Sequence, residues 1–587
     1  MRIPLLLLLA HSVFAGEWKR KWCGKEYRAG QPISPPGGHF PFPVTTTTPQ
    51  LVLRCNAALM PFLPDDLVDN SSSLILVDAL VRYKEIAGAQ PLIIPSSPDV
   101  ELFVNVSVDG MPLTSGTVSL NGSAAIPFSL SAISPRSVPY SLGCTATLSS
   151  SEQNFTSTPT KLVYLPSPPD SIGSITKLDQ RTGGLLAKRA FTQDPYEPIF
   201  PVGFYTQFGG YLEGNDGVLE VLKRQGINVV RVHPIPPYDD LTAFNRMVDK
   251  MEELGLWLMY DMRWSYMNST SVTEQVISLR DRTNLLLYYT ADEPDGSQDP
   301  LAAPASAATL INSLDPYRPS SLVLNCQDYF FSDYAAGTPI LMQDAYPIGI
   351  NPNYSVVYDT PCTTEHGCCG CDNCVGKFED IRNRMDDFAM RLEVLGWERS
   401  KSIWTVPQGF GSAEFWSRTP TYTEFLVQMI VAVNAGARGS ISWTDPTTPD
   451  IKAATSQFTS ALPELTPFLL SSPLSSPPVH FARVITPDRL DFGVWVSSRG
   501  EALVMAANLN YFPLNVVLDE VLSATQFKWL GLVDPRLVVD GGARIVGTRV
   551  TFGSVRSGAW IFRVIQSSWW TTLRMQLDGY IDIFTLN

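Results

Sequence analysis

Between residues 200 and 470 the sequence alternates short apolar runs with longer amphipathic stretches, and this alternation restricts the fold more than any other feature. Eight of the apolar runs have the length of strands. The predicted strands are 202–205, 228–232, 257–260, 285–289, 321–324, 339–342, 402–406 and 439–443. A strand–helix unit that repeats eight times predicts an α/β fold, a closed (β/α)8 barrel of the TIM type.

Helical patterns separate these strands, and several of them end at a glycine such as Gly226 or Gly255, as helix C-termini commonly do. The predicted helices are 217–225, 241–254, 272–282, 302–314, 378–395, 421–435 and a last one over 450–470. A doubly wound open sheet is the alternative fold. It is the weaker prediction because no glycine-rich phosphate loop follows the first strand.

The sequence before and after the predicted barrel has the period-two pattern of antiparallel strands. Residues 45–165 contain short alternating runs separated by turn residues, which predicts an immunoglobulin-like β-sandwich. Residues 166–195 read as a linker with one candidate strand, 183–188, and the barrel is predicted over 196–472. A second, smaller β-sandwich is predicted over 479–565, followed by a tail, 566–587, that has no assignment.

The beginning of the chain predicts export. Residues 1–15 combine Arg2, an apolar run and small residues before a cleavage site, as a secretory signal peptide does. Residues 16–44 form an entry segment rich in proline and glycine, and no later apolar run is long enough for a membrane span. The predicted localisation is secreted, extracellular or cell wall. Six glycosylation sequons fit that prediction, at Asn70, Asn105, Asn121, Asn154, Asn268 and Asn353.

Nine cysteines in an oxidising compartment predict disulfides. Cys55 and Cys144 are placed to join the two sheets of the first sandwich, and Cys326, on a predicted strand, is the expected free thiol. Five cysteines share one loop: Cys362, Cys368, Cys369, Cys371 and Cys374. A zinc knuckle is the alternative for this loop, but His366 is the single imidazole nearby.

The charge of the chain limits its partners. A net charge of −14 argues against nucleic acid and anionic membrane surfaces and favours a neutral or cationic substrate. The five histidines form no His-x-His or His-Glu-x-x-His motif, which disfavours a metal-dependent hydrolase. No metal and no cofactor are predicted, and the oligomeric state is left open.

The apolar run 285–289 leads directly into Asp292, Glu293 and Pro294. Burying two acids there is costly unless each has a partner, and an ordinary strand end seldom places two acids side by side, so the stretch favours a functional site. In a barrel, the C-terminal strand ends carry the chemistry. These ends hold acids, amides and aromatic rings, a lining that suits a sugar. The candidate binding residues are Tyr205, Arg231, Asp261, Trp264, Asp292, Tyr346, Gln408 and Trp443. For Asp261, the alternative to binding a sugar hydroxyl is pairing with Arg231.

The stretch 200–460 resembles the clan A glycoside hydrolases, (β/α)8 barrels with flanking β-sandwich modules. The resemblance lies in Glu293 followed by Pro294 at the fourth strand, in Arg231 at the second and in Trp443 at the eighth. It implies a secreted glycoside hydrolase that cleaves O-glycosidic bonds of a polysaccharide or glycoconjugate. It also implies that Glu293 is the general acid/base.

Two departures from the clan pattern stand out. Asp292 replaces the Asn that precedes the acid/base, and Gln408 stands where the strand-seven nucleophile is expected. An amide cannot attack an anomeric carbon, so a second carboxylate must come from elsewhere. We expect Asp344, after the sixth strand, with Glu414 and Asp292 as other candidates, although Asp292 should point away from its neighbour on an extended strand. A catalytically inactive carbohydrate-binding or adhesive barrel is the alternative function.

Overall fold

The computed structural model describes residues 21–26, 38–67, 73–95, 100–148, 153–192, 194–233, 240–528 and 530–565. The predicted signal peptide, the C-terminal tail and the sequon at Asn70 lie outside these residues. Of the other sequon asparagines, Asn105, Asn154, Asn268 and Asn353 are exposed.

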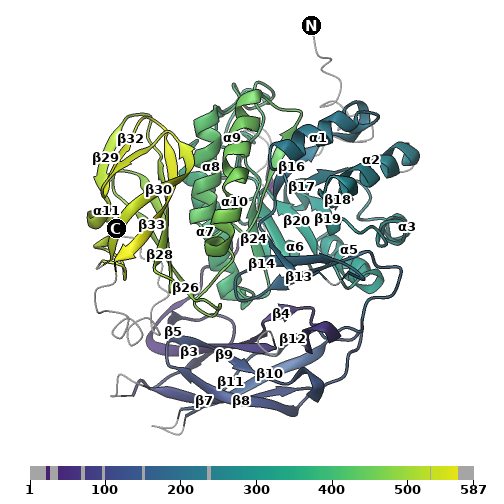
Figure 1. Cartoon of the computed structure of the whole chain (residues 1–587), viewed down its shortest axis with the longest axis vertical. Coiled ribbons are helices and arrows are strands. Elements are labelled where there is room, and N and C mark those ends of the chain that lie inside the picture. Colours follow the sequence, from purple (N-terminus) through teal and green to yellow (C-terminus); the bar gives the residue numbers. More distant parts are fainter. Residues whose placement is uncertain are drawn as a thin grey trace.

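Eight parallel strands close into a barrel at the centre of the molecule (Figure 1), which confirms the predicted fold class. Each barrel strand pairs with the next barrel strand in the sequence, and the last pairs with the first. Their bounds are β16 Val202–Thr206, β17 Val229–Val232, β18 Trp257–Asp261, β19 Leu285–Asp292, β20 Ser320–Leu324, β21 Ile340–Gln343, β24 Ser402–Thr405 and β25 Ser440–Asp445. The strands are buried almost throughout, because the barrel core covers one face and the helices cover the other.

Helices follow most of the barrel strands, close to their predicted positions. They are α1 Asp216–Arg224, α2 Leu241–Glu253, α3 Ser269–Leu279, α5 Ala303–Leu314, α7 Glu379–Leu395, α8 Tyr422–Asn434, α9 Pro449–Ser460 and α10 Leu462–Leu469. The single helix predicted over 450–470 is wrong, because the chain forms α9 and α10 with a break at Ala461. Pro463 explains the break, since it has no N–H to continue the hydrogen bonding of α9. Two short helices, α4 Pro294–Ser297 and α6 Phe331–Ala335, were not predicted.

Two antiparallel sheets precede the barrel and lie below it in Figure 1. One contains β3 Thr45–Ala57, β5 Leu74–Lys84, β6 Ala89–Pro91 and β9 Gly122–Pro127. The other contains β7 Glu101–Val108, β8 Met111–Ser119, β10 Tyr140–Leu148, β11 Gln153–Thr156 and β12 Thr160–Leu162. The predicted disulfide between Cys55 and Cys144 joins the two sheets.

The stretch predicted as a linker with one strand instead contributes two strands to a sheet that closes the lower end of the barrel. This sheet consists of β4 Leu59–Met60, β13 Ser174–Asp179, β14 Gly184–Arg189 and β15 Glu197–Ile199. Leu178 and Leu185 pack in one core with Val229 and Leu287 from the barrel interior. All six residues of β13 and the first two of β14 are buried, which a free linker would not need.

Two antiparallel sheets also follow the barrel, and the five-stranded one packs against α8 (Figure 1). One contains β26 Val479–Ile485, β27 Leu490–Ser497, β28 Glu501–Asn508, β30 Gly531–Gly541 and β33 Ser557–Ile565. The other contains β29 Leu514–Val517, β31 Arg544–Val546 and β32 Arg549–Phe552, with α11 Leu518–Leu522 alongside. Because α8 lies between barrel and sheet, residues 424–434 are buried on every side. In the part of the chain that is described, no helix is both long and apolar enough to cross a membrane.

Candidate active site

Glu293 lies where β19 turns into the short helix α4. Its backbone is left-handed, with φ 51° and ψ 50°, which ends the regular alternation of the strand. Glu293 and its neighbour Asp292 consequently reach different partners, Asn325 for the first and two arginines for the second. The predicted divergence of these two acids is therefore present in the structure.

The carboxyls of Glu293 and Asp344 meet at the side chain of Asn325. The Asn325 Nδ2 donates to Glu293 Oε1 at 3.1 Å and to Asp344 Oδ1 at 3.2 Å. The two carboxyls also hydrogen-bond to each other. Asn325 follows β20 and Asp344 follows β21, so three neighbouring strands deliver the three side chains to one point.

The protein environment separates the titrations of these two acids. Burial, the charge of Asp344 and the hydrogen bond with Asp344 raise the pKa of Glu293 well above its ordinary value. Burial also raises the pKa of Asp344 to about 6, although the hydrogen bond from Glu293 opposes this rise. Burial and the charge of Asp344 thus favour the protonated form of Glu293, whereas the hydrogen bond between the two carboxyls favours the ionised form of Asp344.

Asp295 holds the segment that carries Asn325. Its buried carboxylate accepts hydrogen bonds from the backbone N–H groups of Gly296, Asn325 and Cys326 at 2.9, 3.2 and 2.8 Å. Burial raises the pKa of Asp295 to about 7, while these three hydrogen bonds lower it. The start of the loop after β20 is thereby fixed relative to α4.

Two arginines and two aspartates form a compact ionic cluster on the β17–β19 side of the barrel mouth. Arg231 Nε donates to Asp261 Oδ2 at 2.8 Å, and its Nη2 donates to Asp292 Oδ1 at 3.0 Å. Arg263 pairs with the same two acids. These cations hold the pKa of Asp261 well below its usual range, against the effect of burial. Asp261 is fully buried, so pairing with Arg231 is the role that the structure gives it, while Asp292 keeps a side chain 26% exposed.

Aromatic rings line the mouth beside this cluster. Tyr205 stacks on Trp443 with ring centroids 4.3 Å apart, and the Arg263 guanidinium lies 4.5 Å and 4.9 Å from these two rings. Trp264 is 54% exposed. Tyr346 is buried, and the negative charge of Asp344 contributes to the raised pKa of its hydroxyl. The mouth thus presents flat apolar faces next to charged groups.

Gln408, the residue at the expected nucleophile position, is fully buried and bound to backbone. Its Oε1 accepts from the Ile348 N–H at 2.9 Å, and its Nε2 donates to the carbonyls of Ile348 at 2.9 Å and Phe410 at 3.3 Å. Only an amide can accept and donate in this way. Gln408 therefore joins the loop after β21 to the end of β24, and it does not face the mouth.

Two further polar residues have different surroundings from the buried carboxyl pair. Glu414, a candidate for the second carboxylate, is exposed on the turn between Ala413 and Trp416. His233 is buried, and burial lowers its pKa to about 4, so its imidazole is neutral near pH 7. Asp344 is the acid that the fold brings to Glu293.

The prediction that Cys326 is the free thiol was wrong. Cys326 is not free but forms a disulfide with Cys23, and the other pairs are Cys362–Cys369 and Cys371–Cys374. Cys368 is the free cysteine among the described residues. The expectation for Cys326 was wrong because Cys23 lies 303 positions away, and nothing local signals that contact. The loop also contains the short strands β22 Tyr354–Ser355 and β23 Thr360–Pro361.

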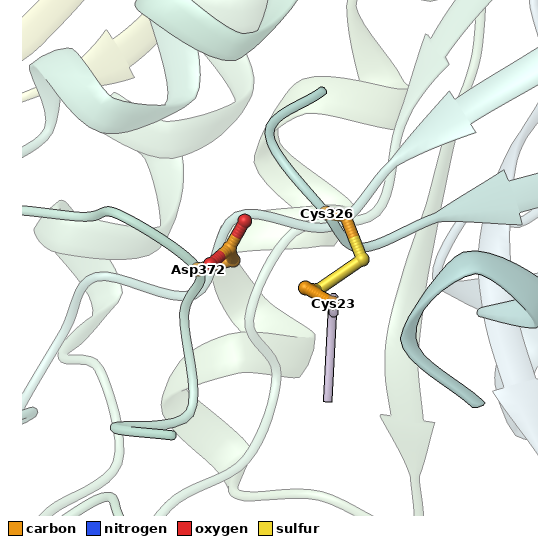
Figure 2. Close-up of side chains that lie close together, drawn as sticks. All are labelled: Cys23, Cys326 and Asp372. Carbon is orange, nitrogen blue, oxygen red and sulfur yellow. A yellow bond between two sulfur atoms is a disulfide. The ribbon is translucent and has the colours of Figure 1, made fainter. Parts of the chain in front are cut away.

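An N-terminal strap, residues 21–26, lies against this site as the hairpin of β1 Lys21–Trp22 and β2 Lys25–Glu26. Figure 2 shows its disulfide from Cys23 to Cys326, with Asp372 beside it. These three residues have the spacing of metal ligands. However, the sulfurs are bonded to each other, and Asp372 binds Lys25 Nζ at 2.5 Å and the Gln327 N–H at 2.9 Å. The group is therefore a disulfide beside an ion pair.

Sequence reasoning missed three residues of the site: Trp22, Arg263 and Asn325. At the fifth strand, Asn325 is the first polar residue after β20, and its side chain reaches both acids. Arg263 was detectable, because it lies two residues beyond Asp261 at the end of β18. Trp22 carried no local signal.

Comparison with known proteins gives fold-level likeness. No protein-family model matches the sequence, and no curated protein matches it. Among solved structures, a Bacteroides fragilis protein provisionally described as an alpha-galactosidase/melibiase has 13% identity and a TM-score of 0.42, covering 80% of this chain and 97% of that chain. Alpha-galactosidase I from Mortierella vinacea has 11% identity and a TM-score of 0.38, covering 62% and 97%. A GH27 β-L-arabinopyranosidase from Geobacillus stearothermophilus also has 11% identity and a TM-score of 0.38, covering 62% of this chain and 97% of that chain. At these TM-scores the likeness carries no inference about chemistry.

Proposed function

We propose that the protein is a secreted glycoside hydrolase that cleaves O-glycosidic bonds of a polysaccharide or glycoconjugate. One observation supports this most strongly: Glu293 and Asp344 bind the same amide nitrogen, and their pKa values differ. Glycoside cleavage needs one protonated carboxyl and one ionised carboxylate on either side of the scissile bond. In this pair the surroundings favour the protonated form of Glu293 and, through the shared hydrogen bond, the ionised form of Asp344.

In this proposal Glu293 is the general acid. A glycosidic oxygen that enters the site takes the proton that Glu293 shares with Asp344, and the leaving group departs neutral. Asp344 is the nucleophile in this proposal. One oxygen of each carboxyl binds the same Asn325 nitrogen, at 3.1 and 3.2 Å, which brings the two acids closer together than the roughly 6.5 to 9.5 Å that leave room for a water molecule between them. The ionised Glu293 then activates water to release the sugar from Asp344. The double displacement gives net retention of anomeric configuration.

The remaining mouth residues suit sugar binding. Pyranosides present apolar faces, which the stacked Tyr205 and Trp443 and the exposed Trp264 can contact. Asp292, held by Arg231 and Arg263, offers a fixed carboxylate for hydroxyl groups. Because the arginines already neutralise this acid, the surface suits a neutral substrate.

Secretion is part of the proposal. The apolar run of the first 15 residues supports it, as do the four disulfides and the exposure of four sequon asparagines. Mass spectrometry of the exported protein should find its N-terminus near residue 16 and glycans on Asn105 or Asn154. Full-length, unglycosylated protein retained inside the cell would contradict secretion.

Carbohydrate binding without turnover is the alternative, and the buried amide of Gln408 at the expected nucleophile position favours it. A screen of neutral oligosaccharides and glycoconjugates separates the two functions. Hydrolysis, with the first product retaining its anomeric configuration by proton NMR, supports the enzyme. Binding without product by the intact protein supports the alternative.

A matched pair of variants identifies the second carboxylate. Asp344→Asn should abolish hydrolysis of the best substrate, whereas Glu414→Gln changes an exposed acid of the same barrel end. If Glu414→Gln is the inactive variant, the assignment of Asp344 is wrong.

A further inference from the structure

The N-terminal strap makes a direct hydrogen bond to the residue that joins the two acids. Trp22 Nε1 donates to Asn325 Oδ1 at 2.9 Å, across 303 positions of sequence. An indole N–H is a donor only, so the atom of the Asn325 amide that faces it must be the oxygen. The amide nitrogen is thereby turned toward Glu293 and Asp344, as observed.

The position of Trp22 is itself fixed by several contacts. A Cβ on Gly296 would lie 2.4 Å from the Trp22 ring, so the indole fits because this residue of α4 is glycine. The disulfide Cys23–Cys326 joins the residues that directly follow Trp22 and Asn325. Farther along the strap, Lys25 binds Asp372 and Asn373, and the Gly367 N–H donates to the Glu26 carbonyl at 2.8 Å.

We propose that Trp22 is a positioning residue of the active site, which sets the orientation of the Asn325 amide and through it the carboxyl pair. This inference builds on the proposed hydrolase function, but the orientation itself is independent of turnover. The strap would then complete the catalytic centre, and the barrel alone would not hold the pair in its working form.

The chemical reason is the difference between the two ends of an amide. With its nitrogen toward the acids, Asn325 donates a hydrogen bond to each carboxyl and stabilises the ionised form of Asp344. Without the Trp22 N–H the amide can rotate and present its oxygen, which accepts only from a protonated carboxyl. Ionisation of the pair then becomes harder.

The other charged and titratable groups around the pair come from every neighbouring element. They are Asp292 of β19, Asp295 of α4, Arg263 after β18, Tyr346 after β21, Cys368 of the cysteine loop and Arg384 of α7. None of them changes when Trp22 loses its N–H. A shift in the titration of the pair can then be assigned to the amide.

Trp22→Phe is the test, because phenylalanine keeps an aromatic side chain in the strap and removes the N–H, while the disulfide still anchors the strap. We expect kcat to fall about tenfold, the order of one lost hydrogen bond to a charged network. KM should stay nearly constant, because Trp22 orients the acids and not the substrate. The acidic limb of the pH–rate profile should move to higher pH. Trp397→Phe, a half-buried tryptophan on the outside of the barrel, is the control and should leave the profile unchanged.

A second measurement does not depend on activity. Infrared difference spectra between the protein and its Glu293→Gln variant isolate the carboxyl pair, and their pH titration should move to higher pH in the Trp22→Phe background. If the screen finds no hydrolysis but this titration moves, the hydrolase proposal fails and the positioning role stands. An unchanged infrared titration, or an unchanged pH–rate profile, in folded Trp22→Phe protein would overturn the positioning role.

Discussion

Glu293 and Asp344 share the amide nitrogen of Asn325 and hydrogen-bond to each other, although they follow different strands, β19 and β21. Their proximity is a consequence of barrel closure, which places the C-terminal ends of all eight strands at one rim. Burial in this position raises the pKa of both acids. The pair therefore differs electrostatically from surface acids and has measurable properties of its own.

The pH dependence of activity follows from the two shifts. Asp344 must be ionised, and its pKa is raised to about 6, so kcat/KM should increase as the pH rises through about 6. Glu293 must be protonated, and its pKa is raised well above the ordinary value, so the loss of activity on the alkaline side should occur at a higher pH than an ordinary glutamic acid would give. A pH–rate profile measures both limbs. Activity that declines steadily from pH 5 to pH 8 would show that the protonation states are assigned wrongly.

Stability should change with pH in a direction set by Asp344. Its folded pKa of about 6 lies above the ordinary value of 3.8, so its contribution is fully present below pH 4 and is lost as the pH rises through 6. The free energy of unfolding should therefore decrease between pH 4 and pH 8. In Asp344→Asn this decrease should be smaller by roughly 3 kcal/mol. Urea unfolding at both pH values measures it, and an equal decrease in the two proteins would refute the raised pKa.

Gln408→Glu restores the residue type of the clan pattern but should not increase activity. The carboxylate would lose the two hydrogen bonds that the amide donates to Ile348 and Phe410, and it would place a charge in a fully buried position. We expect a loss of roughly 3 kcal/mol in unfolding free energy. Thermal unfolding and the hydrolysis assay test this together. A stable variant with higher turnover would mean that this position can face the substrate.

Cys368 gives a direct check of the disulfide pattern. Among the described residues it is the free cysteine, and burial raises its pKa to about 12, so the native protein should resist thiol reagents. Unfolding without reductant should expose one thiol for each chain, on the peptide that contains Cys368. Labelling of Cys326 instead would mean that the strap is not disulfide-linked to the barrel.

Local sequence patterns were sufficient for the barrel and for naming two acids that the fold brings together. The run 285–289 and the acids that follow it identify a strand end at a site, and the position of Asp344 follows from the same reasoning. What local patterns could not provide is the contact between Trp22 and Asn325, because it depends on a segment folding back across 303 positions. They also could not show that Gln408 is bound by backbone, since its partners lie on the loop after β21. The break between α9 and α10 was visible as Pro463 but was outweighed by the apolar periodicity around it.

The rate of hydrolysis by Glu293→Gln, measured beside the unaltered protein on its best substrate at pH 7, tests the central claim most directly. Glutamine keeps the shape of the side chain and the contact with Asn325 but has no proton to transfer to a leaving oxygen. We predict that kcat falls by about 10² to 10⁴ while the variant remains folded. Turnover by Glu293→Gln at the rate of the unaltered protein would contradict the assignment of Glu293 as the catalytic acid.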